Sequence, residues 1–540
     1  MKKLAKIFIA FALFGATFSM VGCDGLLNVD SDRIVMQNQY NFKSANDTLY
    51  SMFGILSQLE KLADSYVLIG ELRGDLMDVT PTSNIYLKEI NSFNFSDNNP
   101  YVNNIKDYYA VINNCNYVIH NIDTTVVKGG LKVMLKEYSA AKAIRAWTYL
   151  QIVLNYGSAH YYVNPILTVA DANAIQNQTP LTLEQIAPLL IQDLLPFQDV
   201  PKPDLGSLYS HNLSNSFFPV RFVLGDLYLW TGQYENAANE YHDLMFNNYY
   251  LITNSYQSRR LATNNAFNGT IINNWSNLFS AGSSEYITSI AAANVYGKFF
   301  ELDSMNFDHS IVASAVAKHN WASQMYYYSN VLDTLGDLRA LGSWGRSIVL
   351  QNGAYFLSDS IIVKDYIMNQ NTNKQVMPYR VALLYLRYAE AVNRLNKPNL
   401  ALAVLKYGMN RVTFGNSKAI PKSEIPSPLP NYMDFRDTRF DTNIGIRMRG
   451  CGNVNQDTTY YIIPKLNMLS DSVLYVEDLI QKELALETAC EGNRFQDLMR
   501  FAIRRNDNSY LANIVASKYG DNREAIRTKL MDRKNWYLKP

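Results

Sequence analysis

A helix–turn–helix unit with tetratricopeptide spacing sets the strongest limit on the fold. Residues 221–250 alternate small and bulky side chains at the spacing of one such repeat: Leu224, Gly225, Tyr228, Ala237 and Tyr241. The small residues allow two helices to approach closely, and the bulky ones fill the seam between them. Leu383–Met409 is a weaker copy of the same pattern, with Pro398 in its turn, where a missing N–H is harmless. The sequence therefore predicts stacked helical pairs.

Helical periodicity also covers much of the remaining chain. Residues 131–156 form a wide apolar stripe, which is typical of a helix packed into a core. The segments predicted to be helical are Ser44–Asp64, Tyr101–Asn121, Leu131–Tyr156, Leu181–Phe197, Phe217–Phe246 and Val473–Ala489. We therefore predict a mostly α fold with a tetratricopeptide-like helical scaffold.

Residues 251–377 differ in kind from the helical segments around them. They are rich in Asn, Gly, Ser and aromatic residues, and they contain strand-like runs at Glu285–Ile290, Ser347–Phe356 and Ser360–Tyr366. A long irregular segment inside a helical scaffold often carries function, because its side chains are not consumed by packing. We predict a large loop-rich insertion that contains short strands and faces the ligand.

The N-terminus has the plan of a bacterial lipoprotein signal. Lys2, Lys3 and Lys6 precede an apolar run of about a dozen residues, which is too short to span a bilayer. Gly22 and Cys23 close the run like a lipobox, in which the cysteine becomes the lipidated first residue. We expect a signal peptide at 1–22, a lipid-anchored linker at 23–46, and a single domain at 47–540. Its scaffold is expected at about 47–250 and 378–540.

Charge and cysteine content narrow the possible partners and bonds. The net charge is +1, from 49 basic and 48 acidic residues, so electrostatics give no reason to expect nucleic acid as a partner. Besides Cys23, the chain contains only Cys115, Cys451 and Cys490. Cys115 lies in a helical pattern, and we interpret it as a small core residue. A Cys451–Cys490 bridge is conceivable, but the spacing alone does not support it.

The sequence contains no recognisable catalytic motif. It lacks a Gly-x-Ser-x-Gly elbow, a phosphate loop, a His-Glu-x-x-His helix and a paired Cys-x-x-Cys. Its six histidines never fall at metal-ligand spacing. We expect no cofactor, no metal and no enzymatic activity. Carboxylate pairs for glycoside hydrolysis meet only in the folded protein, so that class of activity stays open.

The order of these parts resembles the SusD/RagB family of nutrient-binding outer-membrane lipoproteins from Bacteroidetes. A terminal Glu-Gly-x-Arg-Phe-x-Asp-Leu motif is the most specific feature, with Phe495 where the family commonly has tryptophan. The resemblance runs from Cys23 to the C-terminus. The motifs that carry it are Gly70–Asp75, Ala143–Tyr149, Tyr385–Ala391, Ile446–Gly450, Glu487 and Glu491–Leu498.

We interpret these motifs as structural rather than ligand-binding. Charged and small residues near helix ends usually serve capping and packing. Gly492 suits a helix C-terminus, and Asn493 with Gln496 suits an N-cap and its reciprocal partner.

The resemblance implies a surface-exposed lipoprotein of the outer membrane that captures an oligosaccharide or polysaccharide. It would deliver the glycan to a SusC-like TonB-dependent transporter and act as a lid over the barrel. In the family, ligands meet a shallow surface built from the loop after the Arg-Gly-Asp-like segment and from the insertion. In this chain those regions supply aromatic rings and polar groups suited to sugars: Asn84, Tyr86, Trp275, Tyr286, Tyr296, Trp321 and Tyr327.

Three other functions compete with this interpretation. A peptide-binding member of the same family would need grooves that bond to a peptide backbone. A tetratricopeptide lipoprotein that scaffolds outer-membrane assembly would show an uninterrupted repeat array, which the insertion argues against. A surface glycoside hydrolase would show turnover.

Overall fold

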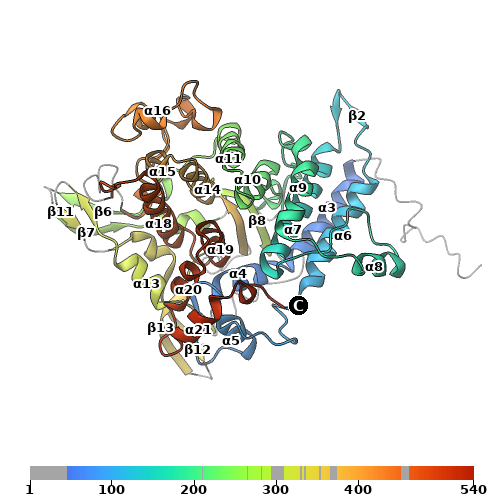
Figure 1. Cartoon of the computed structure of the whole chain (residues 1–540), viewed down its shortest axis with the longest axis horizontal. Coiled ribbons are helices and arrows are strands. Elements are labelled where there is room, and N and C mark those ends of the chain that lie inside the picture. Colours follow the sequence, from blue (N-terminus) through green and yellow to red (C-terminus); the bar gives the residue numbers. More distant parts are fainter. Residues whose placement is uncertain are drawn as a thin grey trace, which may run out of the picture.

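Helices packed side by side make up most of the molecule (Figure 1). The computed structural model describes residues 45–539, except 209–210, 264–265, 281, 293–308, 329–330, 334–335, 352–353, 365–373 and 452–460. Consecutive members of the row α3, α6, α7, α10, α11, α14 and α18 contact one another. The predicted fold class, a mostly helical scaffold with an insertion of short strands, is confirmed.

The N-terminal half supplies the first helices of this row and two short hairpins. The predicted helix at Ser44–Asp64 is two helices in the structure, with a break at residues 61–62. The elements of the N-terminal half are α3 (Ala45–Glu60), α4 (Ala63–Leu72), β1 (Met77–Val79), α5 (Ile85–Ser92), α6 (Ile105–Asn121), β2 (Val127–Lys128), β3 (Leu131–Lys132), α7 (Leu135–Tyr156), α8 (Val169–Gln176), α9 (Leu183–Leu194), β4 (Ser207–Leu208) and β5 (His211–Asn212).

The two predicted repeats form helix pairs. The first is α10 (Val220–Trp230) with α11 (Tyr234–Asn248), and the second is α14 (Val381–Arg394) with α15 (Pro398–Lys406). An added Cβ on Gly225 would lie 2.3 Å from Cε1 of Tyr241, so the close approach of α10 and α11 requires glycine there. Pro398 is the first residue of α15, a position that needs no N–H donor.

Among the C-terminal helices, α18 packs against both helices of the second repeat, and α19, α20 and α21 follow it in a chain of contacts. They are α16 (Arg411–Gly415), α17 (Met448–Cys451), α18 (Leu469–Glu487), α19 (Arg494–Arg505), α20 (Asn508–Ala516) and α21 (Arg523–Leu530). Among the described residues, no helix combines the length and hydrophobicity needed to cross a membrane.

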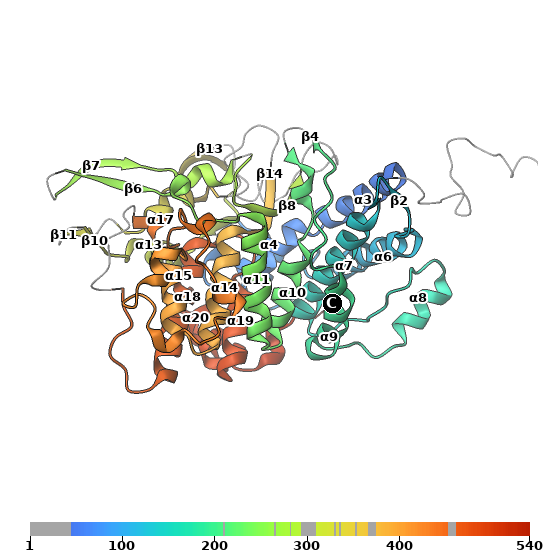
Figure 2. The same cartoon turned by 90° about the horizontal axis from the view of Figure 1, so that it is seen from above.

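In the described part of the insertion, the strands form two-stranded antiparallel ribbons, and α13 is the one α-helix. Figure 2 shows its strands gathered along one edge of the helical row. The elements are β6 (Arg259–Thr263), β7 (Ala266–Ile272), β8 (Tyr286–Ala292), β9 (Ile311–Ala313), α13 (Ala315–Ala322), β10 (Tyr326–Tyr328), β11 (Val331–Asp333), β12 (Trp344–Gln351), β13 (Ala354–Ile362) and β14 (Lys374–Arg380).

Two pairings tie the insertion to the rest of the chain. Strand β9 pairs with β1, which lies far upstream, with Met77 opposite Ala313 and Val79 opposite Ile311. Strand β14 pairs with β8 and leads directly into α14. The predicted strand at Glu285–Ile290 is β8. The predicted single strand at Ser347–Phe356 is instead a hairpin, in which Gln351 of β12 pairs with Ala354 of β13.

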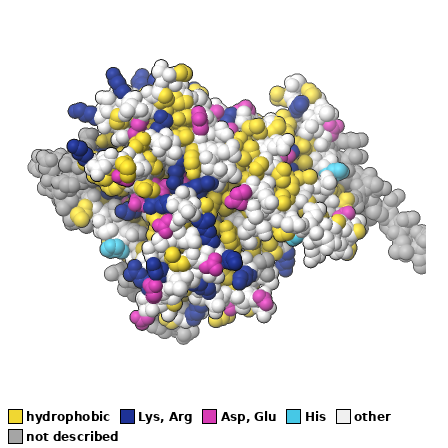
Figure 3. All heavy atoms as spheres, in the orientation of Figure 1, with side chains coloured by type: hydrophobic (Ala, Val, Ile, Leu, Met, Phe, Trp, Pro, Cys, Tyr) yellow, Lys and Arg dark blue, Asp and Glu magenta, His cyan; other side chains and the backbone are white. Residues whose placement is uncertain are grey.

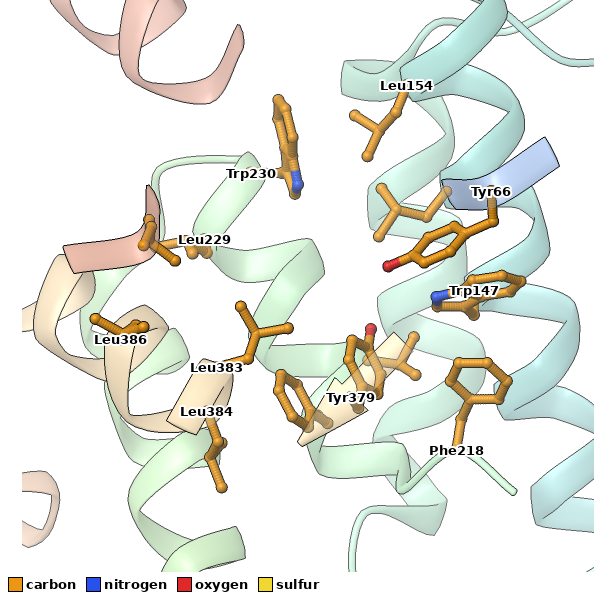
Figure 4. Close-up of a cluster of buried hydrophobic side chains, with 14 of the residues drawn as sticks. Tyr66, Trp147, Leu154, Phe218, Leu229, Trp230, Tyr379, Leu383, Leu384 and Leu386 are labelled. Atoms are coloured by element: carbon orange, nitrogen blue, oxygen red, sulfur yellow. The ribbon is translucent and has the colours of Figure 1, made fainter. Parts of the chain in front are cut away.

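A hydrophobic core joins α4, α7, α10 and α14 (Figure 4). The ring centroids of Trp147 and Phe218 are 4.6 Å apart, and those of Phe222 and Tyr379 are 3.8 Å apart. The hydroxyls of Tyr379 and Tyr241 donate to the buried carboxylate of Asp226, at 2.6 and 2.8 Å. Their polar tips are thereby satisfied inside the core, as buried hydroxyls require.

Candidate ligand-binding face

The loop after β1 meets the insertion at a junction, which we define as residues 80–86 together with residues 309–313. The Thr80 hydroxyl donates to the backbone carbonyl of His309 at 2.6 Å, and the Ser83 hydroxyl donates to that of Ser310 at 2.6 Å. These bonds extend the β1–β9 ribbon. The two regions that the resemblance singles out for ligand contact are therefore adjacent in the structure.

The Gly70–Asp75 motif holds the start of this ribbon in place. Glu71 accepts hydrogen bonds from the backbone N–H groups of Gly492 and Cys490 at 2.8 and 3.1 Å. Burial raises the pKa of Glu71 to about 7, although these N–H groups oppose that shift. Asp75 binds Arg494 through two bonds of 2.5 and 3.0 Å. The motif is buried and fixes the backbone, in agreement with its structural interpretation.

The predicted capping role of Asn493 and Gln496 is wrong. Asn493 makes no capping bond at the start of α19, and instead its amide oxygen accepts from the Tyr66 hydroxyl at 2.9 Å. Gln496 donates to the side chain of Asn155 at 2.9 Å. The carboxylate of Glu71, which comes from another helix, already accepts from the N–H groups beside α19, so no local cap is needed there.

Asn84 and Tyr86 lie on the exposed side of the junction. Asn84 is exposed and is the N-cap of α5, where its side-chain oxygen accepts from the Leu87 N–H at 2.9 Å. Its next neighbour, Ile85, is 62% exposed. Tyr86 is half-buried. The structure therefore places these two predicted residues together, near the surface.

Trp275 is completely buried, unlike a ring that stacks on a surface ligand. Its indole N–H donates to the Ser343 hydroxyl at 3.2 Å. The cationic groups of Lys364, Arg380 and Arg449 lie 5.5, 5.7 and 6.0 Å from its ring centroid. The ring therefore covers a group of buried cations.

Two other predicted rings also lie in the interior. Trp321 is 2% exposed, and its indole N–H donates to the Leu486 carbonyl at 3.1 Å. Tyr286 is 6% exposed and packs in a small cluster with Trp275. An open aromatic platform made of Trp275, Tyr286 and Trp321 does not fit this burial, because none of these rings presents a face to solvent. Trp275 and Trp321 anchor the insertion to its surroundings, and Tyr286 packs within it.

The other predicted positions are only partly described. Cys23 and Tyr296 lie outside the described residues. Tyr327 belongs to β10, and its backbone pairs with Leu332 of β11. Its side chain is not among those that the structure describes. The Cys451 side chain is likewise not among those described, so the structure does not test whether Cys451 pairs with the buried Cys490.

Trp344 is a ring that sequence reasoning missed. The other five tryptophans are at most 5% exposed, whereas Trp344 is half-buried. It begins β12 opposite Ile362 of β13, and β13 packs beside β9 of the junction. The Lys318 amine lies 5.6 Å from its ring centroid. No local pattern in the sequence separates it from the buried tryptophans.

A buried ion cluster locks the insertion onto the scaffold. Its members are Glu285, Asp337, Arg339, Lys364, Arg380, Arg449, Glu483, Glu487 and Glu491. At its centre, Glu487 of α18 contacts Arg339, Arg380 and Arg449 at 2.7, 2.8 and 2.9 Å. Burial alone raises the pKa of a carboxyl, but these guanidinium groups hold the pKa of Glu487 well below its usual range.

The junction offers binding groups rather than a recognisable reaction centre. Within the described ranges, no group of three or more His, Cys, Asp or Glu residues is arranged to hold a metal ion. The exposed groups are a backbone turn, hydroxyls, an amide and a partly exposed indole. Such groups can bond to hydroxyls and stack on apolar ring faces.

Comparison with known proteins identifies the family. The model of the SusD family matches residues 227–540, which is more than half of the chain. No curated protein sequence matches it. A SusD superfamily protein from Bacteroides thetaiotaomicron VPI-5482 has a similar structure, with a TM-score of 0.58 and 15% identity over 91% of this chain and 95% of that one.

Two further solved structures share the fold. A SusD-like carbohydrate-binding protein from Bacteroides vulgatus ATCC 8482 has a TM-score of 0.55 and 16% identity over 84% of this chain and 83% of its own. NanU from B. fragilis has a TM-score of 0.55 and 16% identity, over 89% of this chain and 93% of its own. The match to the family model and the shared fold lead to one conclusion: this chain belongs to the SusD family.

Proposed function

We propose that this protein is a non-enzymatic, cell-surface lipoprotein that captures an oligosaccharide or polysaccharide at the junction. The observation that carries the proposal is the junction itself, where the loop of residues 80–86 and the insertion are bonded together. The half-buried Trp344 pairs with β13, which packs beside β9 of the junction. A partly exposed indole suits the apolar face of a sugar, and Asn84 and the nearby hydroxyls suit its polar edge. Family membership and a neighbour described as carbohydrate-binding support the same function.

Asn84, Tyr86 and Trp344 are the proposed ligand contacts among the described side chains. Tyr296 and Tyr327 stay proposed contacts on sequence grounds. The buried Trp275, Tyr286 and Trp321 are assigned to holding the insertion in shape. A peptide ligand would instead need a groove with unpaired backbone groups, such as an open strand edge.

The test is calorimetric titration of a lipid-free form beginning at Asp24 against plant, host and microbial polysaccharides. The products are analysed on the same samples. Saturable binding without cleavage supports capture, whereas cleavage moves the protein to the glycoside hydrolases. If no glycan binds, a peptide ligand or a purely structural role becomes the better account.

A variant locates the binding site. Trp344→Ala is expected to weaken glycan binding by about tenfold, because an aromatic anchor commonly contributes 1–2 kcal/mol or more. Tyr50→Ala is the control, since Tyr50 is 71% exposed on α3. Equal affinities for Trp344→Ala and the unaltered protein would place the glycan elsewhere.

Delivery to a SusC-like TonB-dependent transporter is the second half of the proposal. We propose that the lipid on Cys23 anchors the protein to the outer membrane, facing the cell exterior, and that the helical scaffold docks on the transporter. Exposed apolar side chains are frequent in the part of the scaffold from β2 to residue 195, which supports a protein partner there: Val127, Leu131, Val163, Leu167, Val169, Leu189 and Leu195.

A further inference from the structure

A groove of about 590 Å³ lies between α13 of the insertion and helices α18 and α20. It is separate from the residues that define the junction, and its volume is in the range of small-ligand sites. Figure 3 shows charged side chains of both signs gathered over the half of the surface that contains these helices, whereas the half around α7 and α9 is poorer in charge. The lining of the groove combines apolar side chains, such as Leu479 and Ile514, with charged and polar ones.

The floor of the groove is rigid because its charges bind one another. Asp75 and Arg494 form the bidentate pair already described, and Arg494 also donates to the Gln481 carbonyl at 3.3 Å. Glu483 binds Arg339 of the buried ion cluster at 2.6 Å. Asp75, Glu483 and Arg494 are each at most 5% exposed. A ligand thus meets groups that are already oriented and need no reordering.

Arg447 and Tyr461 line one side of the groove, and the Arg447 guanidinium is stacked between two tyrosines. The Arg447 guanidinium lies 4.6 Å from the ring centroid of Tyr326 and 4.2 Å from that of Tyr461. Arg447 also donates to the side-chain oxygen of Gln324 at 3.1 Å, and it is only 8% exposed. Stacking fixes the plane of the guanidinium, which suits recognition of a planar carboxylate.

The groups that line the groove carry one surplus positive charge. The basic residues Arg447, Lys482 and Arg494 outnumber the acidic residues Asp75 and Glu483, with histidine taken as neutral. Lys482 is exposed at the rim. Asn513 of α20 and Ser517, which follows this helix, add an amide and a hydroxyl. This combination of hydroxyl-binding groups and cations suits a sugar that bears a carboxylate.

We propose that the groove binds an acidic sugar unit, with its carboxylate at Lys482 and Arg447 and its hydroxyls at the surrounding amides and hydroxyls. The proposal extends the glycan-binding function with a second contact region, and it names uronic acids as the class of sugar recognised there.

The test is titration of the lipid-free protein with oligogalacturonates of two and three residues. The same oligosaccharides with their carboxyls reduced to alcohols serve as matched neutral ligands. We expect saturable binding of the acidic form that weakens as salt is added, and at least fivefold weaker binding of the reduced form. No saturable binding of the acidic form, or equal affinity for both forms, would overturn the proposal.

Variants locate this binding. Lys482→Ala is expected to weaken binding of the acidic form by about two- to fivefold, as an exposed ion pair allows, and Lys482→Glu by more. Lys128→Ala, an exposed lysine on β2, is the matched control. Ser517→Trp fills the rim and is expected to reduce affinity more than tenfold, with Ser417→Trp at an exposed turn as its control.

The outcomes separate this proposal from the proposed function. Unchanged affinity of Lys482→Glu and Ser517→Trp for the acidic form would overturn binding in the groove. If Trp344→Ala still impairs capture of a polysaccharide in that case, the junction function stands without the groove. Thermal unfolding of each variant shows that the fold is intact.

Discussion

Gly70 lies where α4 touches the turn before α19, backbone against backbone. A Cβ added to Gly70 would lie 1.9 Å from the carbonyl oxygen of Gly492. Gly70→Ala must therefore push the two segments apart, and we expect a loss of about 3 kcal/mol in the free energy of unfolding. Urea unfolding of the lipid-free protein measures this loss.

Gly54 provides the control for that substitution. It is also a helical glycine, in α3, but an added Cβ would meet nothing within 4 Å. Gly54→Ala should therefore stabilise the protein by about 0.5–1 kcal/mol through higher helix propensity. An unfolding midpoint for Gly70→Ala at or above that of the unaltered protein would contradict the close contact.

Glu487 is the acid on which the buried ion cluster depends. Glu487→Gln leaves three arginines with a neutral partner, so we expect a loss of about 3–5 kcal/mol at neutral pH. Because the folded-state pKa of Glu487 is lowered, the folded protein holds fewer protons at this site than the unfolded chain does. The stabilisation is therefore complete above its ordinary pKa of 4.5 and is lost as the pH falls through the lower folded value.

Unfolding at a series of pH values checks this expectation. The difference in stability between the unaltered protein and Glu487→Gln should be largest near pH 7 and shrink progressively below pH 4.5. Glu524→Gln, at an exposed position on α21, should show no such difference. If the difference in stability between the unaltered protein and Glu487→Gln stayed constant as the pH fell, Glu487 would stabilise the fold by packing rather than by charge.

At the scale of elements, Ser314 links β9, α13 and the upstream chain. Its hydroxyl donates to the Asp75 carbonyl at 2.5 Å and accepts from the Ala317 N–H at 3.0 Å as the N-cap of α13. Ser314→Ala removes both bonds, so we expect a local loss of about 1–2 kcal/mol. Hydrogen exchange followed by mass spectrometry should show faster exchange across residues 311–322.

Ser323 tests whether that effect is specific. It lies at the other end of α13 and is exposed, and its hydroxyl makes a long 3.4 Å contact with the Asn320 carbonyl. Ser323→Ala should leave exchange in β9 unchanged. Faster exchange in β9 for both variants would show that any change in α13 loosens the ribbon, and would remove the special role of Ser314.

The helix pairs could be predicted because their signal is local. Gly225 and Tyr241 are close in sequence and meet within one repeat, so spacing alone indicates the contact. The prediction of one strand at Ser347–Phe356 runs through three residues that are not apolar, 351–353, and the structure divides this run between β12 and β13. The Asn352-Gly353 pair inside that run is a recognised signal of a two-residue turn and could have divided it.

The candidate site was predictable only in part, because burial depends on contacts that are distant in sequence. Trp275 is buried by cations from β14, α17 and the insertion, and Trp321 bonds to α18. No local pattern distinguishes these tryptophans from the half-buried Trp344. The junction itself was predicted through the family resemblance, since no spacing in the sequence indicates that β1 pairs with β9.

Across the whole molecule, the proposed glycan contacts and the exposed apolar residues proposed to meet the transporter, from β2 to residue 195, lie on different elements. Trp344 belongs to the strand-rich insertion, at one edge of the helical row (Figure 2). Helix α8 projects from the opposite end of the molecule and has no buried residue (Figure 1). Glycan capture and transporter docking, as proposed, should therefore be separable by substitution.

The double variant Leu167→Asp, Val169→Asp tests that separation. These side chains are 55% and 76% exposed at the start of α8, so charging them leaves the fold intact but places carboxylates in any apolar interface there. We expect loss of co-purification with the transporter and unchanged glycan affinity, the reverse of Trp344→Ala. Val412→Asp on α16 is the matched control, because Val412 is also 76% exposed. If the double variant lost glycan affinity and kept the transporter, the two surfaces would have to be exchanged, with the insertion against the transporter and the N-terminal helices toward the glycan.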